Sequence, residues 1–309
     1  MSGLLESGAQ LEKVATGTTW AEGPVWIPER RAVRYSDIPG DRIMEFSEPT
    51  GESSVYRHPA GFTNGRTRDP DGSVVQCSHG HRAVEREVDG VVSTLVDSWR
   101  GSRLNSPNDV VIASDGAIWF SDPAYGIKKE GEGHAGEEEY GDRYVFRFEP
   151  ATGRLDPVVT DLEEPNGLAF SPDESLLYVS DTSREPPGPP HVSQPFGHAI
   201  HVYDVVDGCH AKNGRTLVVV EPGLPDGFRV DQYGNLWSSS GDAVQVFSPR
   251  GELLERVPVP EVIANVCFGG EDGQTLYIAA STSLYRIRTT VTDAVSRRPR
   301  PRPELDARS

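Results

Sequence analysis

Six places along the chain carry an oxygen-bearing side chain just before a short run of strand-forming residues. Any one of them alone would indicate only a turn, because Asn, Asp and Gly favour turns. Six equivalent positions indicate shared chemistry instead, since carboxylate and amide oxygens are the ligands that Ca²⁺ prefers. Mg²⁺ and Mn²⁺ suit such a set as well, and Zn²⁺ suits it less. The six residues are Glu22, Asn64, Asn108, Asn166, Asp226 and Asn265.

The elements that must position these residues form a repeat. Each copy contains a semi-apolar run, a turn built on Asp-Gly or Pro-Asp, and a second run rich in β-formers. Repeated hairpins at a spacing of roughly 40 to 60 residues are typical of β-propellers. The clear copies span 66–78, 109–122, 167–181, 227–240 and 265–280, and a degenerate first copy spans 23–37.

A second hairpin signal follows the copies, for example at 83–96, 144–159 and 243–257. Two hairpins supply four antiparallel strands, so the sequence predicts an all-β, six-bladed propeller around a central channel. The start of each first strand and the end of each second strand then lie on one face. The long insertions 123–142 and 182–199 leave second strands, so we expect them to form a lid on that face.

Charge and composition exclude several classes of protein. The chain has 309 residues and a formal net charge of −17, which disfavours binding to nucleic acid. Long apolar runs and an export signal are both missing from the sequence, so we expect a cytoplasmic protein that does not bind membranes. Its three cysteines fit reduced thiols. We expect a monomer or a small homo-oligomer.

The chain is expected to hold one propeller domain and a tail. The domain spans residues 1–290 and closes by pairing both chain ends within one blade. Residues 291–309 are rich in Arg and Pro and show no core pattern, which predicts disorder.

Several motifs carry a resemblance to a known family. AEGPVW near the start, RLNSPNDVVIASDGAIWFSDPAYG before residue 127, EPNGLAFSPDE and LPDGFRVDQYGNLW together resemble gluconolactonase, regucalcin and luciferin-regenerating enzyme. The likeness covers about residues 15–288 and is closest to the bacterial gluconolactonases. It implies a lactone-opening hydrolase that acts on a small lactone with one divalent metal in the axial channel, commonly Ca²⁺.

The resemblance also implies roles for individual residues. The metal ligands would be Glu22, Asn166 and Asp226, with Asn108 as a fourth ligand or a substrate contact. Asp226 is the usual candidate for the base, although a role as ligand alone stays open. This chain departs from the family at Ser78, where gluconolactonases often carry Glu, which puts the substrate contacts of the second blade in doubt.

Other residues could bind the substrate. Asn64 lies at a strand entrance, and His79 leaves a second strand, where it could contact substrate or carry a proton. Arg103 and Tyr125 could form the wall of a pocket that binds a polyol. Two alternatives to sugar-lactone hydrolysis stay open: another metal-dependent reaction, such as hydrolysis of phosphotriesters or non-sugar lactones, and a non-catalytic Ca²⁺-binding propeller.

Overall fold

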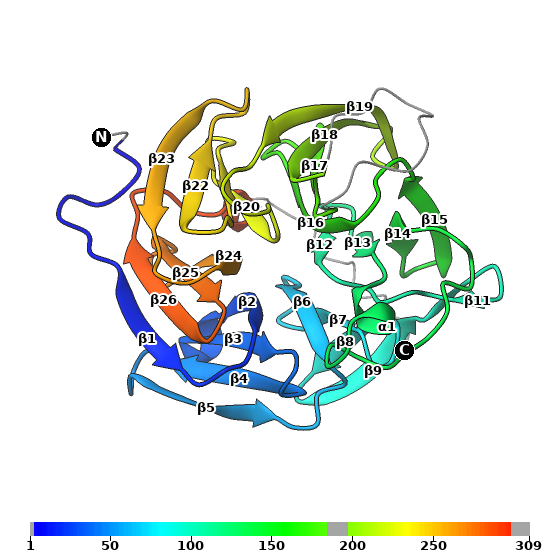
Figure 1. The fold of residues 1–309 in the computed structure, drawn as a ribbon, viewed down its shortest axis with the longest axis horizontal. Helices are drawn as coiled ribbons and strands as arrows, with labels where there is room; N and C mark the ends of the chain where they lie inside the picture. The colour runs from blue at the N-terminus through cyan, green and yellow to red at the C-terminus, as the bar shows by residue number, and fades with distance from the viewer. Residues whose placement is uncertain (1–2, 184–196, 298–309) are drawn as a thin grey trace, which may run out of the picture.

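Six four-stranded antiparallel sheets surround one axis in the computed structural model, which describes residues 3–183 and 197–297 (Figure 1). The fold is therefore the six-bladed β-propeller that the repeats predict. The strands run, from the axis outward, as follows: blade 1, β2 (Ala21–Ile27), β3 (Ala32–Asp37), β4 (Arg42–Ser47) and β5 (Glu52–Arg57); blade 2, β6 (Thr63–Arg68), β7 (Val74–Ser78), β8 (Ala83–Val88) and β9 (Val91–Val96); blade 3, β12 (Val110–Ile112), β13 (Ile118–Asp122), β14 (Tyr144–Glu149) and β15 (Arg154–Val159).

The second half of the ring repeats this order. Its blades contain the following strands: blade 4, β16 (Pro165–Phe170), β17 (Leu176–Asp181), β18 (Ala199–Val206) and β19 (His210–Val219); blade 5, β20 (Phe228–Val230), β21 (Leu236–Ser238), β22 (Ala243–Phe247) and β23 (Leu253–Pro258); blade 6, β24 (Ile263–Gly269), β25 (Thr275–Ala280), β26 (Ser283–Arg288) and β1 (Glu12–Thr16).

The ring closes within blade 6. Strand β1 from the start of the chain pairs antiparallel with β26 from its end, so that Glu12 opposes Arg286 and Thr16 opposes Ser283. This confirms that both ends of the chain share one blade. The pairing joins residues far apart in the sequence and leaves no blade open at the seam.

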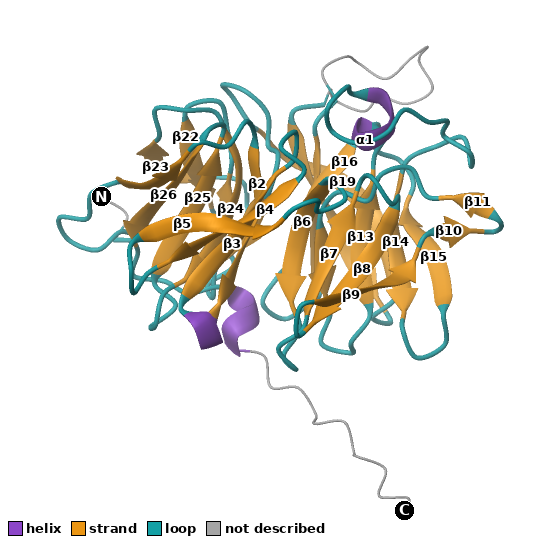
Figure 2. Cartoon of the chain, turned by 90° about the horizontal axis from the view of Figure 1, so that it is seen from below, coloured by secondary structure: helices purple, strands orange, loops and turns teal. Residues whose placement is uncertain are grey.

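The two faces of the propeller carry different structures. Helix α1 (Tyr125–Lys128) lies on one face, and the 3₁₀ helices η1 (Pro28–Arg30) and η2 (Ala294–Arg297) lie on the other (Figure 2). A small ribbon of β10 (Ser98–Trp99) and β11 (Ser102–Arg103) projects from the connection between blades 2 and 3. Among the described residues, no helix has both the length and the apolar character needed to cross a membrane.

Aromatic side chains fill the spaces between neighbouring blades. Trp119 of blade 3 meets Phe170 of blade 4 edge to face, with ring centroids 5.2 Å apart. Trp237 of blade 5 packs on Phe268 of blade 6 in the same way, at 5.5 Å. Both tryptophans are fully buried. The hydrophobic core is therefore a series of layers between blades, each built from the facing surfaces of two sheets.

The inner strands approach one another so closely near the axis that side chains are excluded at some positions. A Cβ atom on Gly167 of β16 would lie 2.4 Å from the carbonyl oxygen of Asp226. A Cβ atom on Gly227 would lie 2.0 Å from Cγ of Asn265 in β24. Glycine at these two positions lets three neighbouring blades meet. The same approach carries the preceding residues, Asn166 and Asp226, to the axis.

The end of the described chain differs from the predicted tail. Val291 and Ala294 are buried, at 1% and 3% exposed, and each belongs to a hydrophobic core cluster. Residues 291–294 are therefore packed on the propeller, because this short stretch does hold apolar side chains that the Arg- and Pro-rich composition around it masks. The rest of the predicted tail, 298–309, lies outside the described residues.

Gly167→Ala should destabilise the propeller by about 1–3 kcal/mol, because the added methyl group meets the backbone of blade 5 and not a movable side chain. Chemical denaturation followed by tryptophan fluorescence measures the change. Gly136→Ala is the matched control, since its Cβ would lie no closer than 3.2 Å to any neighbour, the nearest atom being Nη1 of Arg82. Equal stability of the two variants would contradict the close approach of the inner strands.

Candidate functional site

A cavity of about 610 Å³ opens at the axis on the face that carries α1. It contains five of the six residues predicted at the strand entrances: Glu22, Asn64, Asn108, Asn166 and Asp226. The sixth, Asn265, does not line the cavity but donates a hydrogen bond from Nδ2 to Oε2 of Glu22 at 3.1 Å. The repeat thus brings together side chains from five blades.

Two carboxyl groups of this cavity lie in surroundings that disfavour their charged forms. Burial, with the charges of Asp226 and Asp109, raises the pKa of Glu22 well above its ordinary range. Burial also raises the pKa of Asp226 to about 7, with contributions from Glu132 and Asp109. Carboxylates gathered in a low dielectric repel one another, so a bound cation would stabilise their ionised forms.

The amide side chains complete a donor set that fits a hard cation. The side chain of Asn166 lies beside Asp226 and lowers the pKa of that carboxyl, and its amide oxygen can act as a further acceptor. The Oδ1 atom of Asn64 is buried and has no hydrogen-bond partner among the described residues. His, Cys, Asp and Glu side chains alone form no metal-binding group of three or more in that part of the chain, so a cation here would need amide oxygens as well. Ca²⁺ and Mg²⁺ accept such mixed oxygen ligands.

The loop that leaves β13 forms the rim of the cavity, as the sequence predicts for the 123–142 insertion. The hydroxyl groups of Tyr125 and Thr182 are hydrogen-bonded at 2.6 Å. Lys129 forms an ion pair with Glu132 and lies 5.9 Å from the ring centroid of Trp20. All five side chains line the cavity, so its rim offers hydroxyl, ammonium, carboxylate and aromatic groups.

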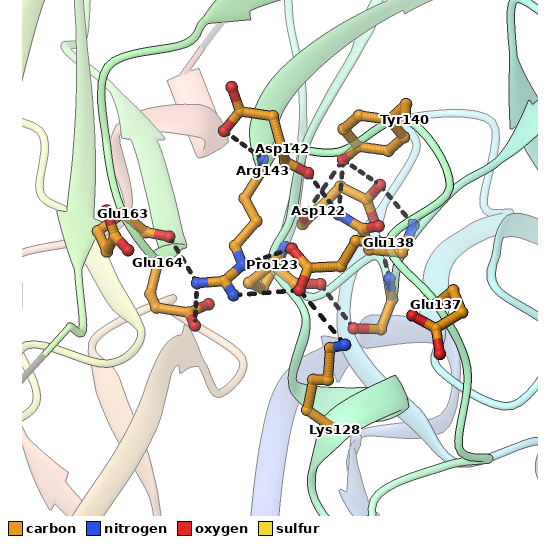
Figure 3. A network of polar contacts seen from close by, with 12 residues as sticks. Asp122, Pro123, Lys128, Glu137, Glu138, Tyr140, Asp142, Arg143, Glu163 and Glu164 are labelled. Carbon is orange, nitrogen blue, oxygen red and sulfur yellow. Dashed lines mark hydrogen bonds and ion pairs between the residues drawn. The ribbon is translucent and has the colours of Figure 1, made fainter. Parts of the chain in front are cut away.

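A network of charged residues ties this rim to blade 4 (Figure 3). Arg143 donates to Oε1 of Glu164 at 2.5 Å and to Oε2 of Glu138 at 3.0 Å. Lys128 at the end of α1 lies 3.6 Å from Glu138. Beside it, Asp122 accepts hydrogen bonds from the Tyr140 hydroxyl and from two loop amides, all at 2.8 Å. The loop is therefore anchored at both of its ends.

Glu164 is a carboxyl group of the rim whose two oxygens lie in different surroundings. Its Oε1 is held by Arg143, while Oε2 is buried without a partner among the residues that the structure describes. Burial raises the pKa of Glu164 to about 7. Glu164 lines the cavity, so its carboxyl group adds an acceptor to the rim, with Oε2 itself covered in this structure.

Two of the predicted substrate contacts lie elsewhere. His79 is fully buried and does not line the cavity, because the rim loop covers it. Arg103 lies in the exposed β10–β11 ribbon and donates to the carbonyl oxygen of His81 at 3.1 Å. Neither residue is placed to touch a molecule in the axial cavity. Tyr125, Asn64 and Asn108 do line it.

Sequence reasoning missed much of the rim. Trp20, Lys129, Glu132 and Thr182 come from loops, which show no periodic pattern that would place a side chain. Glu164 did carry a signal, since it lies two residues before Asn166 in the same strand entrance. Of the predicted 182–199 insertion, residues 184–196 lie outside the described residues.

The SMP-30/Gluconolactonase/LRE-like region matches residues 20–282, which covers nearly the whole propeller. The chain belongs to this family. The resemblance predicted from the sequence motifs is thereby confirmed.

Several members of the family are similar to this chain over most of its length. The gluconolactonase of Zymomonas mobilis is 35% identical over 94% of this chain and 84% of its own. The pentonolactonase of Haloferax volcanii is 30% identical over 87% of this chain and 84% of its own. The solved structure of a gluconolactonase from Xanthomonas campestris superposes with a TM-score of 0.84 at 37% identity, covering 93% and 92% of the two chains.

In this family member, Asp226→Asn should stabilise the metal-free protein at pH 8. The folded wild type must keep ionised a carboxyl group whose pKa is about 7, whereas the unfolded chain ionises it near about 3.9. The gain in melting temperature should be full above pH 7, shrink as the pH falls and vanish below about pH 4. Calorimetry in chelator from pH 4 to 8 measures it.

Asp242→Asn, which removes an exposed carboxylate, is the matched control and should show no such dependence on pH. A gain that grows toward acid, or no gain at pH 8, would contradict the crowding of carboxyl groups at the axis.

Proposed function

We propose that this chain hydrolyses sugar lactones in the axial cavity and does so with one divalent cation, for which Ca²⁺ is the best match. The observation that carries the proposal is the gathering of five oxygen-bearing side chains at the base of a cavity with a polar rim. The similarity to gluconolactonases and a pentonolactonase supports lactone opening as the reaction.

The rim of the cavity suits a substrate rich in hydroxyl groups. The volume of about 610 Å³ is in the range of small-molecule sites and accommodates a single sugar ring. Lys129 is a donor, the carboxyl group of Glu164 is an acceptor, and Tyr125 can serve as either. A purely apolar lactone would offer none of these groups a partner, so we expect preference for hydroxylated rings.

Glu22, Asn166 and Asp226 would hold the cation, with Asn108 as a further ligand or a substrate contact. When bound, a divalent cation polarises the lactone carbonyl, activates water and orients the ring. The same charge relieves the repulsion that raises the pKa of Glu22 and of Asp226. The crowded carboxylates are therefore suited to the loaded state of the site.

Asp226 is the residue that we assign to proton transfer. Its carboxylate lines the cavity and keeps part of its surface open to it. In the hydrolysis, a carboxylate oxygen of Asp226 accepts a proton from the attacking water, and the C–O bond of the ring then breaks. Asp226 returns that proton to the ring oxygen, which leaves as a hydroxyl group of the product hydroxy acid.

Chelation should abolish turnover of D-glucono-δ-lactone, and Ca²⁺ should restore it. Glu22→Gln should weaken Ca²⁺ binding at least about a hundredfold, because loss of even an outer-shell partner costs roughly 10–100-fold. Titration calorimetry measures binding without reliance on turnover. Glu130→Gln removes an exposed lid carboxylate and should bind Ca²⁺ normally. Full activity in chelator would contradict the metal requirement, whereas normal Ca²⁺ binding by Glu22→Gln would contradict the ligand assignment.

Glu164→Gln should raise KM for glucono-δ-lactone about tenfold, the usual scale for one hydrogen bond to a charged group. It should leave KM for δ-valerolactone unchanged, because that ring has no hydroxyl groups to donate. Steady-state kinetics with both lactones measures the difference. Glu163→Gln, an exposed neighbour with the same change of charge, is the control. Equal effects on both lactones would show that Glu164 does not recognise hydroxyl groups.

A further inference from the structure

His79 is buried behind the cavity with both ring nitrogens engaged. Its Nδ1 lies 2.9 Å from the backbone carbonyl oxygen of Glu132 in the rim loop. A carbonyl oxygen only accepts, so Nδ1 must carry the proton. Burial lowers the pKa of His79 and keeps the ring neutral. The other nitrogen, Nε2, is therefore an unprotonated acceptor.

The amide of Asn64 is held by that acceptor. Its Nδ2 lies 3.3 Å from Nε2 of His79 and donates to it. The two ends of an amide point apart, so Oδ1 is turned away from the buried ring. Asn64 lines the axial cavity, and Oδ1 is the buried acceptor left without a partner among the described residues. A reversed amide would set its oxygen against the lone pair of Nε2.

We propose that His79 is a positioning residue: it fixes the amide of Asn64 so that Oδ1 faces the axial cavity and accepts a hydrogen bond from a hydroxyl group of the lactone. The proposal rests on the proposed lactonase function. It assigns His79 a role in recognition although the side chain touches no substrate. The chain of hydrogen bonds from the Glu132 carbonyl through His79 to Asn64 is called the relay below. The carbonyl oxygen requires a proton on Nδ1 of His79, and the unprotonated Nε2 in turn requires a donor from Asn64.

The rim loop sets the start of this relay. The backbone of Gly126 in α1 lies against His79 so closely that a Cβ there would be 2.5 Å from Cβ of His79. The same loop supplies the Glu132 carbonyl. With the loop in place, the tautomer of His79 is fixed, and the amide of Asn64 has one favourable orientation. The loop thus shapes the base of the cavity as well as its rim.

A double-mutant cycle tests whether His79 acts through Asn64. His79→Phe keeps a ring of similar size without the acceptor and should lower kcat/KM for glucono-δ-lactone about tenfold, as expected for one hydrogen bond. Asn64→Leu should lower it at least as much. The double variant should be no worse than Asn64→Leu alone. Additive losses would overturn the proposal, because they would show that His79 contributes independently of Asn64.

Two further measurements separate positioning from a merely structural role. His79→Gln supplies an amide that can donate to the Glu132 carbonyl and accept from Asn64, and it should recover most of the activity that His79→Phe loses. Nitrogen NMR of ¹⁵N-histidine-labelled protein should show a neutral His79 with Nδ1 protonated, and its Nε2 signal should shift in Asn64→Leu. A proton on Nε2 in the wild type would overturn the proposal whether or not the protein opens lactones. No turnover of any lactone, with the relay seen by NMR, would instead count against the proposed function.

Discussion

The convergence of six inner strands on one axis is the constraint on which the rest of the structure depends. At Gly167 the neighbouring backbone, and at Gly227 the side chain of Asn265, leave no space for even a methyl group. The residue before each glycine is consequently delivered to the axis, where the corresponding residues of other blades also arrive. Glycine removes the steric barrier, and the oxygen-bearing neighbour becomes the lining of a cavity. In these repeats the glycine permits the close packing of the blades, and the residue before it supplies the side chain that lines the cavity.

This convergence creates an electrostatic conflict that the protein only partly resolves. Asn265 donates to Glu22, and Arg229 lies 3.5 Å from Asp109, so some of the axial charge is balanced by fixed donors. The pKa of Glu22 nevertheless stays raised by burial and by its acidic neighbours. Residual repulsion of this kind lowers stability, and the proposed cation would relieve it, which is a common relation between function and stability.

Sequence patterns predicted the axial residues because the repeat gives each of them an equivalent place. Glu22, Asn166 and Asp226 could therefore be grouped without any structure. The rim could not be predicted in the same way, since Lys129 and Glu132 lie in a loop whose path depends on tertiary contacts. His79 was expected to touch substrate because it leaves a strand on the correct face. Its burial follows from the loop that covers it, which no local pattern records.

In the proposed mechanism, reaction and recognition are carried by different parts of the chain. The axial donor set belongs to strand entrances that the packing of the blades fixes in place, whereas the rim belongs to loops that packing leaves free to vary. Loop variation can change the ring that is accepted without disturbing the carboxylates at the axis. The relay from Glu132 to His79 limits this freedom, because a changed loop must still present a backbone carbonyl to Nδ1. Almost any residue can supply a backbone carbonyl at this position. The loop can therefore change in sequence while the hydrogen bond to Nδ1 of His79 is kept.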